Sequence, residues 1–118
     1  MYDLPKKMSF EFLEGRELEL ICFGPYAVTL HFEDHIQIQI EGAFEHAGKH
    51  KADGELYSFP IHGSHLMRLL TQQVTAADAK RDGTLAIEFS NGDRLTIQGN
   101  VSPYESYNVR YPGGVVVV

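Results

Sequence analysis

The chain has 118 residues, of which 43% are hydrophobic and 22% charged, and its formal net charge is −6. These values are typical of a globular protein with one core, so we expect residues 1–118 to form a single domain. The single cysteine excludes an intrachain disulfide, and no segment approaches the ~20 apolar residues that a membrane-spanning helix needs.

The distribution of charge and the N-terminal sequence indicate where the protein is located and what kind of partner it binds. The N-terminal stretch MYDLPKKMSFEF lacks the apolar run and cleavage site of a signal peptide, which together with the lone thiol predicts a cytoplasmic protein. Residues 17–48 contain acidic side chains but no lysine or arginine, whereas the rest of the chain is balanced. Such an excess disfavours nucleic-acid binding and favours a basic protein partner; the alternative is a solvated acidic surface that keeps a small protein soluble.

The N-terminal third predicts a short segment followed by a three-stranded meander. Residues 1–16 are expected to be helical or irregular, with Phe10, Phe12 and Leu13 docking onto the core. A strand is predicted over residues 17–23. Its alternation places three side chains on the inward face: Leu18, Leu20 and Cys22.

Residues 28–42 carry the clearest pattern. Apolar side chains alternate with polar ones over 28–32 and again over 36–40, with Glu33-Asp34-His35 between them, which predicts a half-buried β-hairpin closed by Gly42.

The middle of the chain is less regular. Residues 43–60 read as an irregular connection in which 55–59 add one short strand. A helix is predicted over Ser64–Gln72, because Ser64 suits an N-cap and leucines recur at i, i+3 and i+4.

The C-terminal part predicts a second meander and a hairpin. Strands are expected over 74–80, 84–89 and 94–98, with the hairpin signal Asn91-Gly92 before the last of them. Residues 105–110 and 115–118 then form a hairpin. Four successive valines indicate either a strand buried on both faces or an edge strand that pairs with a second copy of the chain.

The two meanders resemble each other at an offset of 57 positions, which places Phe32 on Phe89 and Gly42 on Gly99. An internal duplication is one reading, and a chance likeness of two meanders is the other. The predicted fold class is α+β: mainly antiparallel β, with two three-stranded meanders, a C-terminal hairpin and one short helix. A sandwich, a strongly bent sheet and a partly open barrel all fit this content.

The run VTAADAKRDGTLAIEFSNGDRLTI, followed by YESYNV and a terminal valine strand, resembles a family of small bacterial proteins known only as a domain of unknown function. The similarity spans roughly Leu13 to Val118 and consists of turns and hydrophobic alternation. The resemblance therefore implies a fold and brings no catalytic residues.

No constellation typical of catalysis or metal binding is present in the sequence. The pairs His31/His35 and His46/His50 have the i, i+4 spacing of metal ligands, but they fall on a turn and a loop rather than on a helix. Cys22 is predicted to be inward-facing and among acids, which does not suit a nucleophile. We therefore expect no enzyme activity, cofactor or metal.

A binding surface is the remaining expectation. Polar side chains on the face opposite the predicted core, together with an apolar end at Ile21 and Phe23, would form a protein-binding face, unless the helix or the N-terminal segment covers these two residues. Tyr104 and Tyr107 are added because tyrosines beside a carboxylate bind ligands, although locking a loop onto a sheet is the more common role. The predicted binding residues are Glu17, Glu19, Phe23, His31, Gln37, Gln39, Glu41, Tyr104 and Tyr107.

Two functions fit these expectations. The first is a non-catalytic binding protein of the toxin-neutralising immunity or adaptor type, with a basic protein partner and with homodimer formation through residues 115–118 as a further option. The second is a small-ligand or metal-binding module with a pocket between the two meanders.

Overall fold

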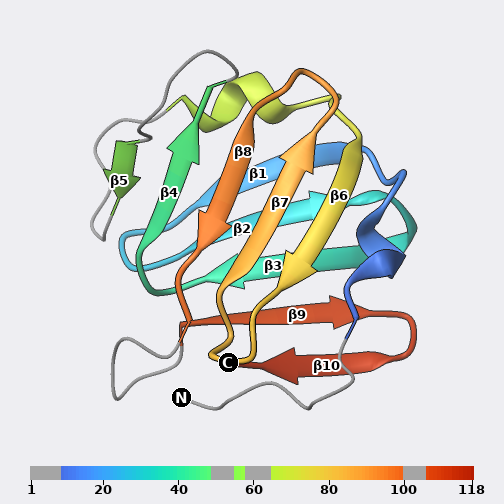
Figure 1. Cartoon of the computed structure of the whole chain (residues 1–118), viewed down its shortest axis with the longest axis vertical. Helices are drawn as coiled ribbons and strands as arrows, with labels where there is room; N and C mark the ends of the chain where they lie inside the picture. Colours follow the sequence, from blue (N-terminus) through green and yellow to red (C-terminus); the bar gives the residue numbers. More distant parts are fainter. Residues whose placement is uncertain (1–8, 49–54, 58–64, 100–105) are drawn as a thin grey trace.

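The protein is a sandwich of two five-stranded antiparallel sheets whose strands cross at a steep angle (Figure 1). The computed structural model describes residues 9–48, 55–57, 65–99 and 106–118. The first sheet has the order β1 (Leu18–Phe23), β2 (Val28–Phe32), β3 (Ile36–Ile40), β9 (Tyr107–Tyr111), β10 (Gly114–Val117). The second has the order β5 (Glu55–Tyr57), β4 (Phe44–Ala47), β8 (Arg94–Ile97), β7 (Leu85–Phe89), β6 (Val74–Ala79).

Both predicted meanders and the C-terminal hairpin are confirmed, and the sandwich is the arrangement adopted among those considered. Strand β4 was not predicted, because it is only four residues long and lies in the stretch that reads as irregular. Its inward positions are Phe44 and His46, and a histidine does not extend an apolar alternation.

The predicted helix is wrong, and with it the α+β class. In the described part of that segment the chain forms the 3₁₀ turn η3 (Leu66–Leu69). The other helical turns described, η1 (Glu11–Leu13) and η2 (Glu33–His35), are also 3₁₀, so the fold is β-rich. One turn is sufficient here because it buries both Leu66 and Leu69 at i and i+3. The chain then leaves helical geometry at Leu70, where ψ is 137°.

The core fills the space between the sheets, and the alternation of β2, β3, β7 and β8 supplies most of it. The alternation predicted over 28–42 is confirmed, since every second residue of β2 and β3, beginning with the first of each strand, is apolar and buried. Phe10 and Leu13 dock onto the core as expected, both with at most 1% of their surface exposed. The centre of the core contains Leu30, Ile38, Phe44, Ile87, Leu95 and Val109.

A β-bulge in β1 reverses its predicted faces. The register shifts between Leu18 and Leu20, so Leu20 pairs with His31 and points outward with 52% of its surface exposed. Ile21 instead packs against the core, and Cys22 is exposed rather than buried. One inserted residue moves every later side chain to the opposite face, which alternation read from sequence cannot reveal.

The two halves of the chain repeat the same hydrogen bonds. The Gly15 N–H donates to the Val74 carbonyl at 2.8 Å, and the Thr71 N–H donates to the Leu18 carbonyl at 2.8 Å. The two donors are 56 positions apart in the sequence, and so are the two acceptors. Gly15 and Thr71 both have positive φ, 82° and 69°. These paired bonds relate the halves by an approximate two-fold axis, as an internal duplication predicts.

The axis passes close to the bridge between Glu17 and Gln73, which are themselves 56 positions apart. The Glu33 N–H donates to the Glu17 carbonyl at 3.0 Å, and the Ser90 N–H donates to the Gln73 carbonyl at 2.8 Å. Strand β6 also repeats the bulge of β1, between Val74 and Ala76.

Each half passes its last hairpin to the other half's sheet. Strands β4 and β5 follow β3 in the chain, yet β4 pairs with β8. Strands β9 and β10 follow β8, yet β9 pairs with β3. Figure 1 shows both hairpins on the sheet opposite to the meander that precedes them. Each sheet is therefore built from both halves of the sequence.

Candidate functional site

The outer face of the first sheet carries the polar side chains that the sequence singled out. Strand pairing aligns them in rows across the sheet, because residues directly opposite each other in antiparallel strands point to the same side. One row consists of Leu20, His31, Gln37, Arg110 and Val115.

A hollow of about 360 Å³ opens where this row meets the β2–β3 turn. It is lined by Glu19, His31, Phe32, Asp34, His35, Ile36 and Gln37. Three of the predicted binding residues, Glu19, His31 and Gln37, are thus brought together. Among the described residues, the lining contains no lysine or arginine. Arg16 Nη1 contacts Asp34 Oδ2 at 2.5 Å, so Asp34 already has a counter-ion and the exposed Glu19 is the carboxylate available to a ligand.

The remaining predicted residues lie elsewhere. Gln39 is in the neighbouring row of the same face, and Glu41 follows the far end of β3. Phe23 is opposite the buried Val28, so it lies on the inward side at the end of β1, with 51% of its surface exposed. Glu17 uses its backbone to bridge the two halves, as described above. Tyr104 lies outside the described residues.

Tyr107 is part of the core and not of any surface. It is fully buried, and its hydroxyl donates to the Gly83 carbonyl at 2.5 Å in the β6–β7 turn. Burial raises the pKa of Tyr107 above its ordinary value, with a smaller contribution from Asp82. The tyrosine therefore locks a loop onto the sandwich. The same turn lies against Gly99, where an added Cβ would be 2.4 Å from the Gly83 carbonyl carbon.

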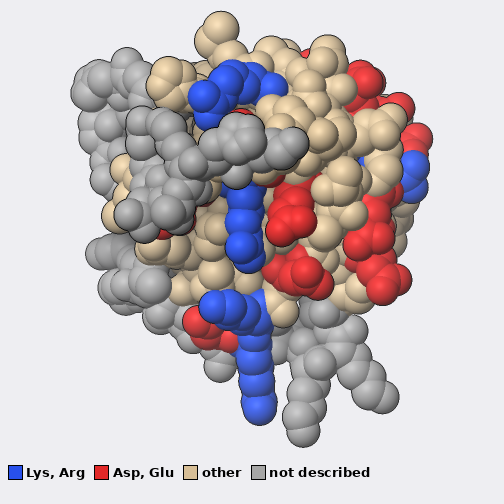
Figure 2. All heavy atoms as spheres, turned by 45° about the horizontal axis from the view of Figure 1, so that its top comes forward, with Lys and Arg blue, Asp and Glu red and all other residues tan. Residues whose placement is uncertain are grey.

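The acidic run of the sequence is divided between several places on the fold. Glu33 accepts a hydrogen bond from the Glu17 N–H at 2.7 Å, and Glu45 lies on the outer face of the second sheet. On the face seen in Figure 2, Asp and Glu side chains gather beside a column of Lys and Arg. The acids that follow one another in the sequence therefore do not all lie on one face.

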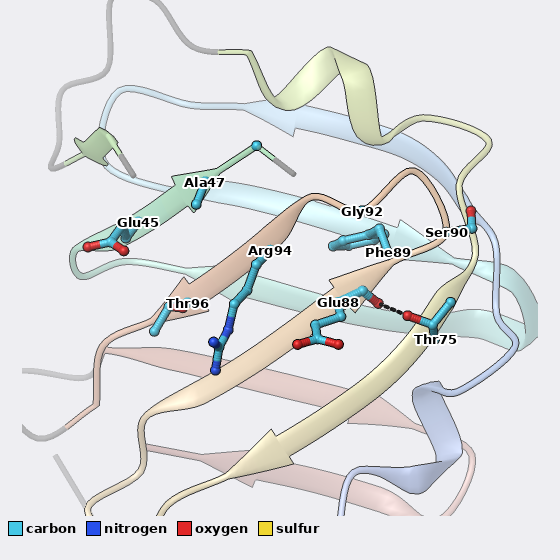
Figure 3. A pocket seen from close by; sticks show the side chains of 10 residues that line it. Glu45, Ala47, Thr75, Glu88, Phe89, Ser90, Gly92, Arg94 and Thr96 are labelled. Atoms are coloured by element: carbon cyan, nitrogen blue, oxygen red, sulfur yellow. Dashed lines mark hydrogen bonds between the residues drawn. The ribbon is translucent and has the colours of Figure 1, made fainter. Parts of the chain in front are cut away.

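A second hollow, of about 580 Å³, lies on the outer face of the second sheet (Figure 3). Small side chains such as Ala47, Thr75 and Thr96 line it, and the charged members among the described residues are Glu45, Glu88 and Arg94. Glu88 and Arg94 are cross-strand neighbours. No ion pair joins them within the part of the chain that is described.

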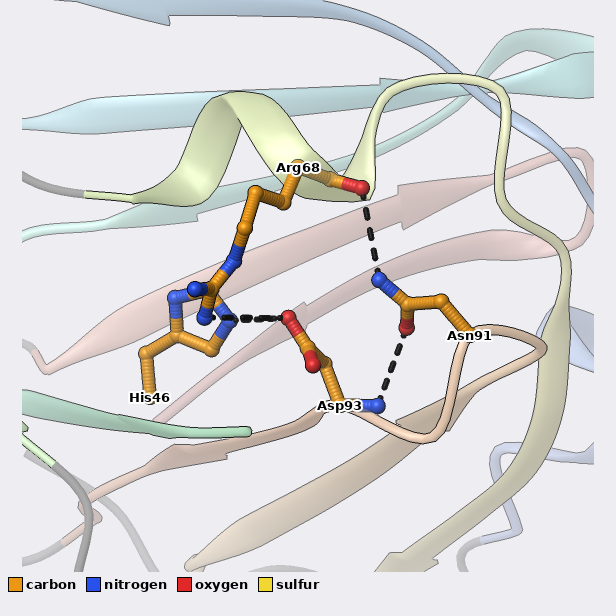
Figure 4. A network of polar contacts seen from close by, with 4 residues as sticks. All are labelled: His46, Arg68, Asn91 and Asp93. Atoms are coloured by element: carbon orange, nitrogen blue, oxygen red, sulfur yellow. Dashed lines mark hydrogen bonds and ion pairs between the residues drawn. The ribbon is translucent and has the colours of Figure 1, made fainter. Parts of the chain in front are cut away.

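The most buried polar cluster was not predicted (Figure 4). His46 Nε2 lies 2.8 Å from Asp93 Oδ2, and their side chains are 1% and 8% exposed. Arg68 Nη2 approaches the same oxygen at 3.4 Å, and Asn91 Oδ1 accepts a hydrogen bond from the Asp93 N–H at 2.9 Å. The cluster ties β4, the β7–β8 turn and η3 together. The His46 and Asp93 side chains are almost fully buried, and a buried polar contact of this kind rigidifies the elements that it joins.

The sequence contains only a weak indication of this buried cluster. His46 stands at an inward position of the short strand β4, but the sequence pairs it more readily with His50, and Asp93 reads as part of the Asn91-Gly92 turn.

Two further observations bear on the class of protein. Among the described residues, no three His, Cys, Asp or Glu side chains come together as a metal site would require. No helix of the described segments is long and apolar enough to cross a membrane.

Comparison with known proteins identifies the family of the chain. No curated protein and no solved structure matches the sequence. The sequence model of a family of unknown function, DUF6188, matches residues 11–118, which include every strand described above. The chain therefore belongs to the DUF6188 family of unknown function.

Proposed function

We propose that the chain is a non-catalytic protein-binding module, of the immunity or adaptor type, that recognises a basic side chain of its partner. The observation that supports this is the hollow in which Glu19, His31 and Gln37 converge. Leu20 stands beside it, half exposed and opposite His31. A partner's lysine or arginine would place its charged head near Glu19 and its aliphatic stem on Leu20, so charge would steer association while an apolar contact anchors it.

Charge reversal at Glu19 tests this proposal against a matched control. The tagged chain is first used to capture partners from a lysate of its source cells at low and at moderate salt. The rate at which the chain associates with the captured partner is then measured. Glu19→Lys is expected to slow association roughly tenfold or more at low salt, with a smaller effect as salt rises. Asp78→Lys makes the same change of charge on β6 of the other sheet, where Asp78 is also exposed.

Equal effects of the two reversals would contradict the proposed site, because they would reflect net charge alone. Capture of no partner at either salt would contradict the binding function itself. Leu20→Ala separates the two contributions: it is expected to speed dissociation and to leave the association rate nearly unchanged.

A small-ligand function is the second candidate, at a different place from the one expected. In the part of the chain that the structure describes, core side chains pack between the two meanders, so we place the candidate pocket on the outer face of the second sheet instead. The hollow of the second sheet favours a polar ligand that carries both charges, since Arg94 and Glu88 flank it without an ion pair between them. A thermal-melt screen of zwitterionic metabolites tests it. A shift that Arg94→Gln abolishes would support this function, and no shift in the whole screen would contradict it.

A further inference from the structure

The outer strand of the C-terminal hairpin, β10, is an edge strand that carries neither a bulge nor a charged side chain. Exposed backbone N–H and C=O groups on an edge strand can pair with another strand, so proteins protect such edges with bulges, charges or short strands. Strands β1 and β6 each carry a bulge, and β5 has only three residues. Strand β10 pairs regularly with β9, and residues 114–117 carry no charge.

The hydrogen-bond pattern fixes which groups of β10 face outward. Tyr107 and Val118 exchange both main-chain hydrogen bonds, at 2.9 and 3.3 Å. Bonded and non-bonded pairs alternate along an antiparallel ladder, so Val116 bonds to β9 while Val115 and Val117 direct their N–H and C=O groups away from it. Within the described residues no strand lies beyond β10.

We propose that two copies of the chain pair through β10 in antiparallel fashion, with the two-fold axis at Val116. This register sets Val115 of one copy opposite Val117 of the other. The outward groups of these residues then form four main-chain hydrogen bonds, and the two first sheets join into one continuous sheet. The proposal is independent of the binding function proposed above.

The distribution of charge favours a second copy as the occupant of this edge. The strand is neutral, so pairing with itself brings no charges face to face. Glu19 and Asp34 lie towards the β1 side, at the opposite edge of the sheet, so the two hollows would be far apart. Within the described strands, the charged residue paired with β10 is Arg110, opposite Val115. Its two copies would lie about 15 Å apart across four strands, beyond the Debye length of ~8 Å at physiological salt.

The test is the association state of the full chain, measured by sedimentation velocity from about 10 μM to about 1 mM. The range extends to high concentration because an interface made by two four-residue strands is small, and small interfaces are weak. Val117→Pro removes an N–H that does not bond to β9, so it is expected to weaken the dimer roughly tenfold to hundredfold without loss of the fold. Val115→Lys places a charge on the paired edge and is expected to act in the same direction. Leu56→Lys, at a 61% exposed position on β5, is the matched control and should leave the dimer unchanged.

Three results would overturn the inference. The first is a monomer over the whole concentration range. The second is a dimer that persists in both Val117→Pro and Val115→Lys. The third is a monomer that loses thermal stability on Val117→Pro, which would mean that another segment of the same chain occupies the edge. A dimer lost in both edge variants and retained in Leu56→Lys supports it.

Discussion

Replacing Thr71 with glycine should stabilise the protein, because the backbone at this position is one that glycine prefers. Thr71 has φ of 69°, and its equivalent in the other half is Gly15, with φ of 82°. A non-glycine residue in this region costs about 1–2 kcal/mol, and a β-branched one is the least suited to it. The Thr71 N–H that bonds to Leu18 is retained by any residue except proline, so the substitution loses no backbone hydrogen bond.

The expected size follows from two opposing effects. Relief of the backbone strain gains about 1–2 kcal/mol, and the greater freedom of glycine in the unfolded chain costs about 0.5–1 kcal/mol. The side chain of Thr71 is exposed, so little packing is lost. The free energy of unfolding should therefore rise by about 0.5–1 kcal/mol, measured by urea denaturation, and the melting temperature by about 2–4 °C.

Two control variants separate backbone strain from side-chain effects. Thr71→Ala keeps the unfavourable φ, so its unfolding free energy should stay well below that of Thr71→Gly. Gly15→Thr should destabilise by about 0.5–1 kcal/mol through strain alone, since no atom of the described chain lies within 4 Å of an added Cβ. The reasoning is refuted if Thr71→Gly is no more stable than Thr71→Ala, or if Gly15→Thr has no effect.

Further predictions concern the buried contacts. Tyr107→Phe leaves the Gly83 carbonyl without its donor and should cost about 1–2 kcal/mol at neutral pH, measured by urea denaturation. The raised pKa of Tyr107 means that above about pH 10 the unfolded chain loses a proton that the folded chain keeps, so wild-type stability should fall with rising pH more steeply than that of Tyr107→Phe; equal slopes would contradict this. Gly99→Ala forces the close approach to Gly83 apart and should lower the melting temperature by at least several degrees, and an unchanged value would show that the turn can shift freely. Asp93→Ala leaves His46 buried without its partner and should cost about 2–4 kcal/mol in denaturation, whereas Asp93→Asn keeps an acceptor and should cost less; equal losses would mean that packing, not the polar contact, is responsible.

Most of the sheet content could be read from the sequence, since strong alternation and turn signals are local. The hairpin over 28–42 and the Asn91-Gly92 turn are examples, and both are found as predicted. The helix was predicted from leucines at i, i+3 and i+4, but the first two of them fit one 3₁₀ turn as well as the start of an α-helix, and the chain leaves helical geometry at the third. The pairing of β4 with β8 could not be predicted, because alternation says which face is buried and not which strand is the neighbour.

The sequence predicted part of the candidate site, namely which polar side chains share one face of the first sheet. Glu19, His31 and Gln37 were assigned to one face and do line one hollow. The apolar contribution was assigned to Ile21 and Phe23, whereas the bulge turns both inward and brings Leu20 to that face instead. The His46–Asp93 contact joins residues 47 positions apart, and nothing in the sequence around either residue indicates that it has a buried partner.

The exchange of hairpins has a consequence for synthesis on the ribosome. When the first half of the chain emerges, its meander lacks β9 and β10, and its own hairpin has no β8 to join. The nascent first half therefore cannot complete either sheet, and it has open edges until strands β6 to β10 have been translated. Truncation at the midpoint would release two fragments that each lack part of both sheets. The two halves can reach the native state only together, although each repeats the pattern of the other.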